Sequence, residues 1–258
     1  MKKLLRSIAF VLCACLCACV FVACDETPSG DGDNSGSTRT WKEMLQSDDM
    51  KNVHIDITDK ATMQGVTNES VSAYRRNGNK YMCKSQFTES GSGEKQTITE
   101  YFEHEGDKWY IYHTAPNDVK MKTELDEDGS YEFTYGEGAH SGNFSQSFMV
   151  VGIIERYMAK LVAVADDFDG GINSNGAKVY TFSGDLLDIY MAMAPDMDAP
   201  PAGLTMTGSI KISVKADKIV KTVFAATMKM NGQTMTEAEM THNFKYDDVT
   251  VTLPEVDG

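Results

Sequence analysis

Methionine is the residue type in this chain with the clearest capacity for unusual chemistry. The 258-residue chain contains 16 methionines, and two short pairs, Met191 with Met193 and Met228 with Met230, place two thioethers two residues apart. Thioethers are soft ligands that suit Cu(I), but they are also flexible, polarizable groups that fill cores and line apolar pockets. Three interpretations are therefore open: core packing, the lining of a site for a hydrophobic ligand, and a copper site.

No motif for catalysis accompanies these methionines. The chain has neither a His-x-x-x-His pair for zinc nor a Gly-x-Ser-x-Gly nucleophile turn, and it lacks a phosphate-binding glycine loop. The acidic run 124–129 begins like a calcium-binding EF-hand loop, but Tyr135 stands where that loop needs a bidentate glutamate. We therefore expect a protein that is not an enzyme and that carries no metal and no cofactor.

The N-terminal segment has the pattern of a secretory signal. Basic residues at positions 2, 3 and 6 precede an uncharged apolar run over 8–23, and Cys24 follows that run directly. The segment resembles the signal peptide of bacterial lipoproteins, which implies cleavage before Cys24 and attachment of acyl chains such as palmitate. Cys19 also fits the cleavage pattern, but acylation there would leave the apolar residues 20–23 exposed.

This resemblance divides the chain into three parts. Residues 1–23 are expected to be the signal peptide, 24–39 the lipidated cysteine with a flexible Gly/Ser/Asp-rich tether, and 40–258 a folded domain. Removal of 1–23 leaves 21 of the 24 basic residues against all 38 acidic ones, a formal charge of −17, which argues against nucleic acid as a partner. After Cys24 only Cys83 remains, so no internal disulfide is possible, and we interpret Cys83 as a small buried hydrophobic residue.

Most of the domain alternates between apolar and polar residues with the period of β-strands. A capping box at Thr40–Glu43 predicts a short first helix, and Asn77-Gly78-Asn79 and Asn231-Gly232 predict hairpin turns. On the face shared by Met240 and Phe244, we interpret His242 as a core histidine bonded to a neighbour. The runs expected to form strands are 53–58, 69–76, 80–88, 95–105, 108–114, 119–125, 131–135, 179–182, 204–215, 219–230, 233–246 and 249–253.

Two longer helices are expected between the strands. Apolar residues recur at spacings of three and four over 148–168, and the second helix, 186–194, ends at Pro195. The short connections between strands require antiparallel pairing. We therefore predict an α+β fold: a single large curved antiparallel β-sheet, an incomplete barrel of about 10–11 strands, with two or three helices covering the concave face. So few helices cannot seal so wide a face, and we expect an apolar cavity between them and the sheet.

This order of elements resembles that of the LolA/LolB and LppX/LprG-type carriers of envelope lipids and lipoproteins. The shared features are the acylated cysteine, the short capped helix, the hairpins ending near Tyr135, the apolar helix over 146–165 and the long final strands that close at 250–254. The likeness concerns layout across 41–254 and transfers no individual binding residue. It implies an incomplete barrel whose helices plug the concave side above a pocket for acyl chains.

The sequence thus predicts a lipoprotein anchored on the extracytoplasmic face of a bacterial membrane, which binds or carries a lipid or the acyl chains of another lipoprotein. Its expected partners are the membrane, through the N-terminal lipid anchor, the hydrophobic ligand, and another envelope protein that delivers or receives it. A non-enzymatic scaffold lipoprotein with a filled core and a Met-rich copper-binding protein are the alternatives. The residues expected to line the cavity, with the helix over 146–165 as its gate, are Phe148, Val151, Ile154, Met158, Met191, Met193, Met206, Met228 and Met240.

Overall fold

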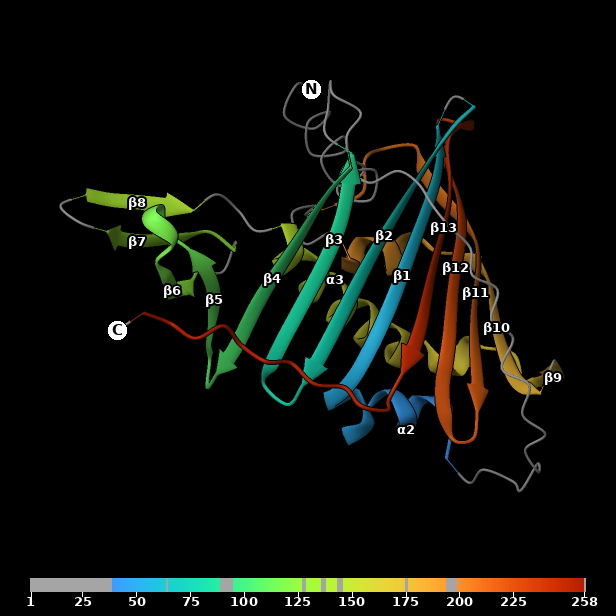
Figure 1. Cartoon of the computed structure of the whole chain (residues 1–258). Helices are drawn as coiled ribbons and strands as arrows, with labels where there is room; N and C mark the ends of the chain where they lie inside the picture. Colours follow the sequence, from blue (N-terminus) through green and yellow to red (C-terminus); the bar gives the residue numbers. More distant parts are fainter. Residues whose placement is uncertain are drawn as a thin grey trace.

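The computed structural model describes residues 39–63, 65–88, 95–126, 129–135, 138–142, 146–174, 176–193 and 199–257. The signal peptide, Cys24 and all of the tether but its last residue lie outside these residues. The domain is built on one open antiparallel sheet of eleven strands with helices packed on one face (Figure 1), as the sequence predicted.

The order of strands in the sheet is β6-β5-β4-β3-β2-β1-β13-β12-β11-β10-β9. Neighbours in this order are also consecutive in the chain, except where β1 meets β13. The sheet thus joins two antiparallel meanders through one non-local pairing, and within the second meander α4 lies in the connection from β10 to β11. The strands are β1 (Asn52–Met63), β2 (Val66–Asn77), β3 (Lys80–Thr88), β4 (Lys95–Glu105), β5 (Lys108–Thr114), β6 (Lys120–Leu125), β9 (Ile172–Ser174), β10 (Ala177–Asp185), β11 (Leu204–Lys215), β12 (Lys218–Met230) and β13 (Gln233–Lys245).

Three α-helices lie on one side of this sheet, which we call the inner face (Figure 1). They are α2 (Trp41–Leu45), α3 (Gln146–Ala163) and α4 (Leu187–Met193), and three short 3₁₀ turns, η1 (Asp48–Lys51), η2 (Pro116–Asp118) and η3 (Ala165–Asp167), join the elements. The predicted capping box is confirmed at α2, where the Thr40 side chain accepts from the Glu43 backbone and the Glu43 carboxylate accepts from the Thr40 backbone. Among the described residues, no helix is both long and apolar enough to cross a bilayer.

Alternation assigns most strand residues to the inner or the outer face, apart from register shifts at Ser213/Val214 and at Met228/Lys229. In β11 the residues Met206, Ile210 and Ile212 are buried on the inner face, and the residues between them are more exposed. The predicted turn at Asn231-Gly232 has positive φ at both residues, as a tight two-residue hairpin turn between twisted strands requires. These turns fix the register, and the register places the buried apolar residues of the long strands on the inner face.

One predicted strand is part of a different sheet. Residues 131–135 do form a strand, β7 (Tyr131–Tyr135), but it pairs with the unpredicted β8 (Gly138–Gly142) in a separate two-stranded sheet. The edge of β6 is partly occupied instead by the C-terminal segment, because the Lys120 backbone accepts from Asp257 N (3.0 Å) and donates to its carboxylate (2.8 Å).

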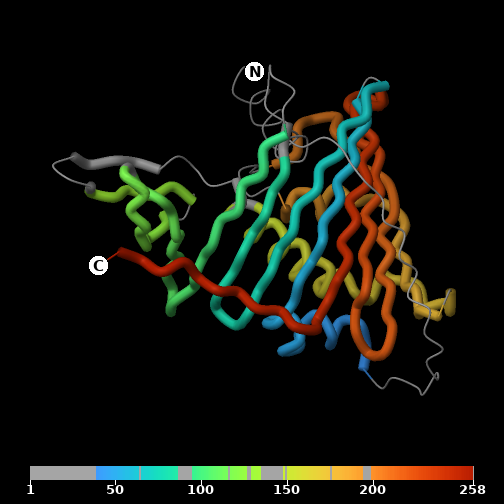
Figure 2. Tube along the Cα trace, viewed as in Figure 1, coloured from blue at the N-terminus to red at the C-terminus, as the bar shows by residue number. Residues whose placement is uncertain are grey.

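The final predicted strand, 249–253, is also wrong. The segment is extended but joins no sheet, and it crosses the outer face near the lower ends of β1–β4 (Figure 2). The Asn77 side-chain amide donates to the Val249 carbonyl at 2.7 Å. Val251, which belongs to the crossing segment, is buried. Alternating apolar residues in this segment therefore serve side-chain contact with the sheet rather than strand pairing.

A close approach of two backbones gives the first testable prediction. Gly208 in β11 faces Ala226 in β12, and a Cβ atom added there would overlap the Ala225 carbonyl oxygen and lie 2.8 Å from Ala226 Cα. Gly208→Ala should therefore lower the free energy of unfolding by about 1–3 kcal/mol, since packed backbone cannot yield easily. Denaturant unfolding measures this, with Gly170→Ala as the control because nothing lies within 4 Å of its Cβ position; equal effects of the two changes would contradict the prediction.

Candidate ligand-binding site

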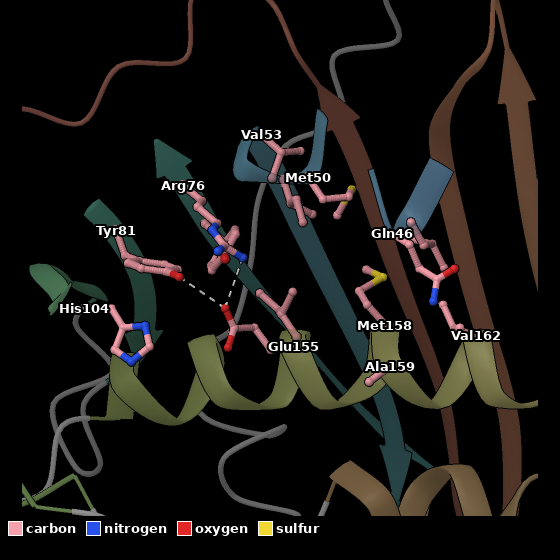
Figure 3. Close-up of a pocket in the computed structure, with 14 residues that line it drawn as sticks. Gln46, Met50, Val53, Arg76, Tyr81, His104, Glu155, Met158, Ala159 and Val162 are labelled. Atoms are coloured by element: carbon pink, nitrogen blue, oxygen red, sulfur yellow. Dashed lines mark hydrogen bonds and ion pairs between the residues drawn. The ribbon is translucent and has the colours of Figure 1, made fainter. Parts of the chain in front are cut away.

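A hollow of about 500 Å³ lies between α3 and the inner face of the sheet (Figure 3). Its volume is within the range of about 300–1,000 Å³ typical of sites for small ligands. Most of its wall is apolar. Arg76, Tyr81, His104 and Glu155 gather toward one end, and Gln46 lies toward the other. The lining residues are Leu45, Gln46, Met50, Val53, Ile55, Tyr74, Arg76, Tyr81, His104, Ile154, Glu155, Met158, Ala159 and Val162.

The register of three strands builds the sheet side of this hollow. Val53 in β1 is paired with Arg76 in β2, which is paired in turn with Tyr81 in β3. Ile55 and Tyr74 form the next inward-facing row. Because paired residues in an antiparallel sheet point to the same face, these five side chains share the inner face.

Helix α3 supplies the opposite wall. Ile154, Met158 and Val162 recur every four residues, which places them along one stripe of the helix. Glu155 and Ala159 stand beside that stripe, and Ala159 is exposed. The helix therefore offers the hollow an apolar stripe with one carboxylate beside it, at the more accessible edge.

The polar end of the hollow is organised around the Glu155 carboxylate. Oε1 of Glu155 lies 3.4 Å from Nη1 of Arg76 and 3.4 Å from the Tyr81 hydroxyl, so two donors from the sheet converge on one oxygen (Figure 3). The Arg76 guanidinium also donates from Nε to the Gly78 carbonyl at 3.1 Å and lies 5.2 Å from the centre of the Tyr81 ring. Arg76 is thereby held in place even without Glu155.

Burial and, as a smaller cause, the nearby Glu155 charge together raise the pKa of Tyr81 to about 12. Burial also raises the pKa of Tyr74 well above its ordinary value. Both phenols therefore keep their protons at neutral pH. The Tyr81 hydroxyl at the polar end is a proton donor and is not a competing anion.

An aromatic cluster stiffens this end of the site. The Trp109 ring stacks on His104 at 4.4 Å between ring centres and contacts Tyr81 at 4.8 Å and Phe148 at 5.3 Å. Phe148 also contacts Phe102 at 5.6 Å. The cluster ties β3, β4 and β5 to the first turn of α3, so Tyr81 and His104 have little freedom to move.

Two of the nine residues predicted to line a cavity, Ile154 and Met158, line this hollow. The other seven do not. Phe148 belongs to the aromatic cluster, and Val151, also on α3, is buried in the core. The five remaining methionines lie on α4 and on the half of the sheet formed by β11–β13. They are Met191, Met193, Met206, Met228 and Met240.

The polar end of the hollow was not predicted from the sequence. Arg76 and Tyr81 flank the predicted Asn77-Gly78-Asn79 turn, and the hairpin register pairs them directly. An arginine at an inward-facing position of a strand was the available signal. Glu155 carried a second signal, as the first charge after an all-apolar helical run.

His242 is a core histidine bonded to a neighbour, as predicted. It is 2% exposed, and its Nδ1 lies 2.9 Å from the Thr222 hydroxyl. Burial lowers the pKa of His242 to about 4, so the ring is neutral at physiological pH. The Tyr157 ring lies over it, with 5.3 Å between centres. Cys83 is fully buried, also as predicted.

Within the described residues, no group of three His, Cys, Asp or Glu side chains is placed to hold a metal ion. Of the methionines that suggested copper, Met228 is buried on the inner face of β12 and Met230 is half-buried at the end of that strand. Met191 and Met193 lie on α4. The copper interpretation stays a prediction.

A second hollow, of about 510 Å³, lies on the other side of the sheet. Its side chains come mainly from outward-facing positions of β1, β2, β11, β12 and β13, and they are hydroxyls, alanines and charged groups. With no large apolar side chain in its lining, it offers an alkyl chain little to bury against. The inner hollow is therefore the candidate site for a hydrophobic ligand.

No family model and no curated protein matches the sequence. Among solved structures, LprF from Mycobacterium bovis is similar with a TM-score of 0.37 at 11% sequence identity, over 84% of this chain and 97% of that one. A DUF1329 family protein from Desulfovibrio piger is similar with a TM-score of 0.25 at 8% identity, over 81% of this chain and 93% of that one. Both TM-scores are below 0.5.

Two aspartates on β1 have pKa values shifted in opposite directions, because they lie on opposite faces of the sheet. Asp56 faces outward, 2.9 Å from His54 Nε2 and 2.8 Å from Lys245 Nζ, and these partners lower its pKa to about 2. Asp59 faces inward, in register with Ser70 and Met240, and burial raises its pKa to about 7. Asp59 is therefore costly to ionise, whereas Asp56 is stabilised as an anion.

Replacement of Asp59 should stabilise the protein only at high pH. The folded-state pKa is above the ordinary value of 3.8, so the folded state binds the proton more tightly and loses stability as pH rises from about 4 to 7. Asp59→Asn should raise the free energy of unfolding by about 1–3 kcal/mol at pH 8 and have almost no effect at pH 4. Urea unfolding across this range measures the difference.

Asp56→Asn is the matched control on the same strand. The pKa of Asp56 is lowered, so its contribution is present above pH 4 and is lost as pH falls toward 2. At pH 8 this change should destabilise the protein. Equal signs for the two substitutions at pH 8 would show that the faces do not differ in this way.

Proposed function

We propose that this protein is a non-enzymatic lipoprotein, anchored to the extracytoplasmic face of a bacterial membrane, that binds or carries a hydrophobic ligand in the inner hollow. The observation that carries this proposal is the hollow itself, whose walls are the apolar stripe of α3 and the inward side chains of β1 and β2. A lipid or the acyl chains of another lipoprotein are the ligands that fit such walls. The anchor rests on the signal-peptide pattern that ends at Cys24.

The binding mechanism is desolvation of an alkyl chain. Each methylene moved from water into an apolar wall contributes about 0.8 kcal/mol. Val53, Ile55, Ile154 and Met158 supply buried apolar surface on both sides of the hollow. A chain of several methylenes could therefore be held without any covalent step, and the accessible edge at Ala159 gives it a route of entry.

Filling the mouth of the hollow should reduce ligand binding. Ala159 lines the hollow and is exposed, so Ala159→Trp adds a large ring at the entrance without burying a charge. Uptake of a fluorescent fatty acid should fall about tenfold or more, because a few methylenes lose their contacts. Ala163→Trp is the matched control, since Ala163 is equally exposed one helical turn further along α3 and is not part of the lining.

The same preparation tests the proposal as a whole. Lipid extraction from the purified protein, followed by mass spectrometry, should recover a co-purifying lipid from the wild type and from Ala163→Trp. Absence of lipid, together with no uptake of the fluorescent fatty acid by either protein, would contradict a carrier and favour a scaffold with a filled core.

Removal of the acylated thiol should release the protein from the membrane. Cys24→Ser cannot accept an acyl chain, and two or more acyl chains are what makes such anchoring stable. Fractionation of expressing cells should move this variant out of the membrane pellet, and metabolic labelling with palmitate should fail. Cys83→Ser is the control, since that thiol is buried in the domain. If the Cys24→Ser variant is still labelled with palmitate, the acylated residue is another cysteine.

A further inference from the structure

The Glu155 carboxylate occupies a position in which two donors of the sheet are ready to bind an anion. Both Nη1 of Arg76 and the Tyr81 hydroxyl point at the same oxygen, Oε1, although the two donors come from different strands. The convergence is a product of the β2–β3 register, which pairs Arg76 with Tyr81. A carboxylate is therefore the group that this end of the hollow is shaped to receive.

The contacts to Glu155 are nevertheless long. Both measure 3.4 Å, whereas charge-assisted hydrogen bonds are usually about 2.7–2.9 Å. Glu155 is attached to α3, so its reach is limited by the helix backbone. A carboxylate that is not attached to the helix can approach the same two donors more closely and form stronger bonds.

The two sides of this ion pair also differ in how easily they move. The Glu155 side chain is 40% exposed, so it can turn toward water at little cost in desolvation. The Arg76 side chain is 26% exposed and is fixed by its bond to Gly78 and by the Tyr81 ring. An incoming anion would therefore displace Glu155 and leave the arginine in place.

We infer that the ligand is a single-chain fatty acid whose carboxylate binds Arg76 and Tyr81, and that Glu155 holds this position while the hollow is empty. The inference rests on the proposed function and names its ligand class. Arg76 is the one arginine or lysine among the fourteen lining residues, so the head group binds at one defined end. The tail then runs between β1 and α3, past Ile55 and Met158, and a hollow of about 500 Å³ accommodates one chain rather than several.

A series of ligands with one tail and three head groups tests the head-group preference. Dodecanoic acid, dodecanol and dodecyltrimethylammonium are titrated into the purified full-length protein by calorimetry at pH 8. The acid should bind about tenfold or more tightly than the alcohol, because a hydrogen bond to a charged group adds to the same apolar burial, and the ammonium should bind most weakly beside Arg76. Equal binding of acid and alcohol would overturn the head-group inference and leave the carrier proposal intact, whereas no binding of any of the three would overturn both.

Replacement of Arg76 and replacement of Glu155 should change the affinity for the acid in opposite directions. Arg76→Gln should abolish the preference for the acid while the affinity for dodecanol stays within about twofold of wild type. Glu155→Gln should tighten the acid several-fold, because it removes the competing charge. Weaker binding of the acid by Glu155→Gln would show that Glu155 is part of the ligand contact and would overturn its role as an occupant of the empty site.

Arg75→Gln is the matched control for Arg76→Gln. Arg75 is the preceding residue of β2 and faces the opposite side of the sheet. Its replacement should leave the affinity for the acid unchanged. Thermal unfolding of each variant checks that the fold is retained, and Tyr81→Phe, which removes only the hydroxyl, gives a second and smaller loss of preference for the acid.

The orientation of the ligand has an independent readout in Trp109, which contacts Tyr81 at the polar end. In a Trp41→Phe background, Trp109 is the one remaining tryptophan of the chain. A fatty acid with a nitroxide near its carboxylate should quench this fluorescence more strongly than one with a nitroxide near its tail end. The reverse order would overturn the assignment of the head group to Arg76 and Tyr81.

Discussion

The ladder between β1 and β13 is the contact on which the rest of the architecture depends. Within each half of the sheet, strands that follow one another in the chain are neighbours, and this pairing alone joins the two halves into one surface. Its register matches Ile55 with Phe244 and Ile57 with His242, so the inward side chains of both halves lie on one side. A slip of one residue would turn β1 over relative to β13 and would remove Val53 and Ile55 from the hollow.

Polar groups are accommodated on this apolar inner face in three different ways. His242 stays neutral and shares a hydrogen bond with Thr222, so its burial carries no charge. Asp59 has no partner among the described residues that offsets its desolvation, and burial raises its pKa to about 7. Arg76 and Glu155 form an ion pair at the accessible edge, with 3.4 Å between Nη1 and Oε1. Only the third arrangement presents charge to the hollow, and this is why the head-group specificity is assigned there.

Local signals explain why much of the fold could be predicted from the sequence. The capping box at Thr40–Glu43 and the turns at Asn77-Gly78-Asn79 and Asn231-Gly232 specify backbone geometry within a few residues. Alternation then orients each long strand independently of its partners. The fold class needs only this information, because short connections between such strands allow little besides an antiparallel meander.

Most of the features that escaped prediction depend on contacts distant in sequence. β8 is an exception, because it has little strand character, with glycine at both ends, and forms by pairing with the adjacent β7. The segment 249–257 alternates like a strand but is fastened by Asn77 and Lys120, which belong to distant strands. The hollow required knowledge of which strands face α3, and the methionines chosen for it from composition lie mainly on β11–β13 and α4. Residue type indicated an apolar site, but strand order determined its place.

The burial of α3 also limits how a ligand can enter. Tyr157 and Leu161 on this helix have no exposed surface, so swinging the whole helix away from the sheet would expose its best-packed side chains. Glu155 and Ala159 lie on a more accessible part of the same helix. Opening there requires only that the Glu155 side chain leave Arg76, which breaks two long contacts and no core packing. In the proposed binding mode, the Glu155 side chain would therefore act as the gate, and the carboxylate of the fatty acid would replace its contact with Arg76.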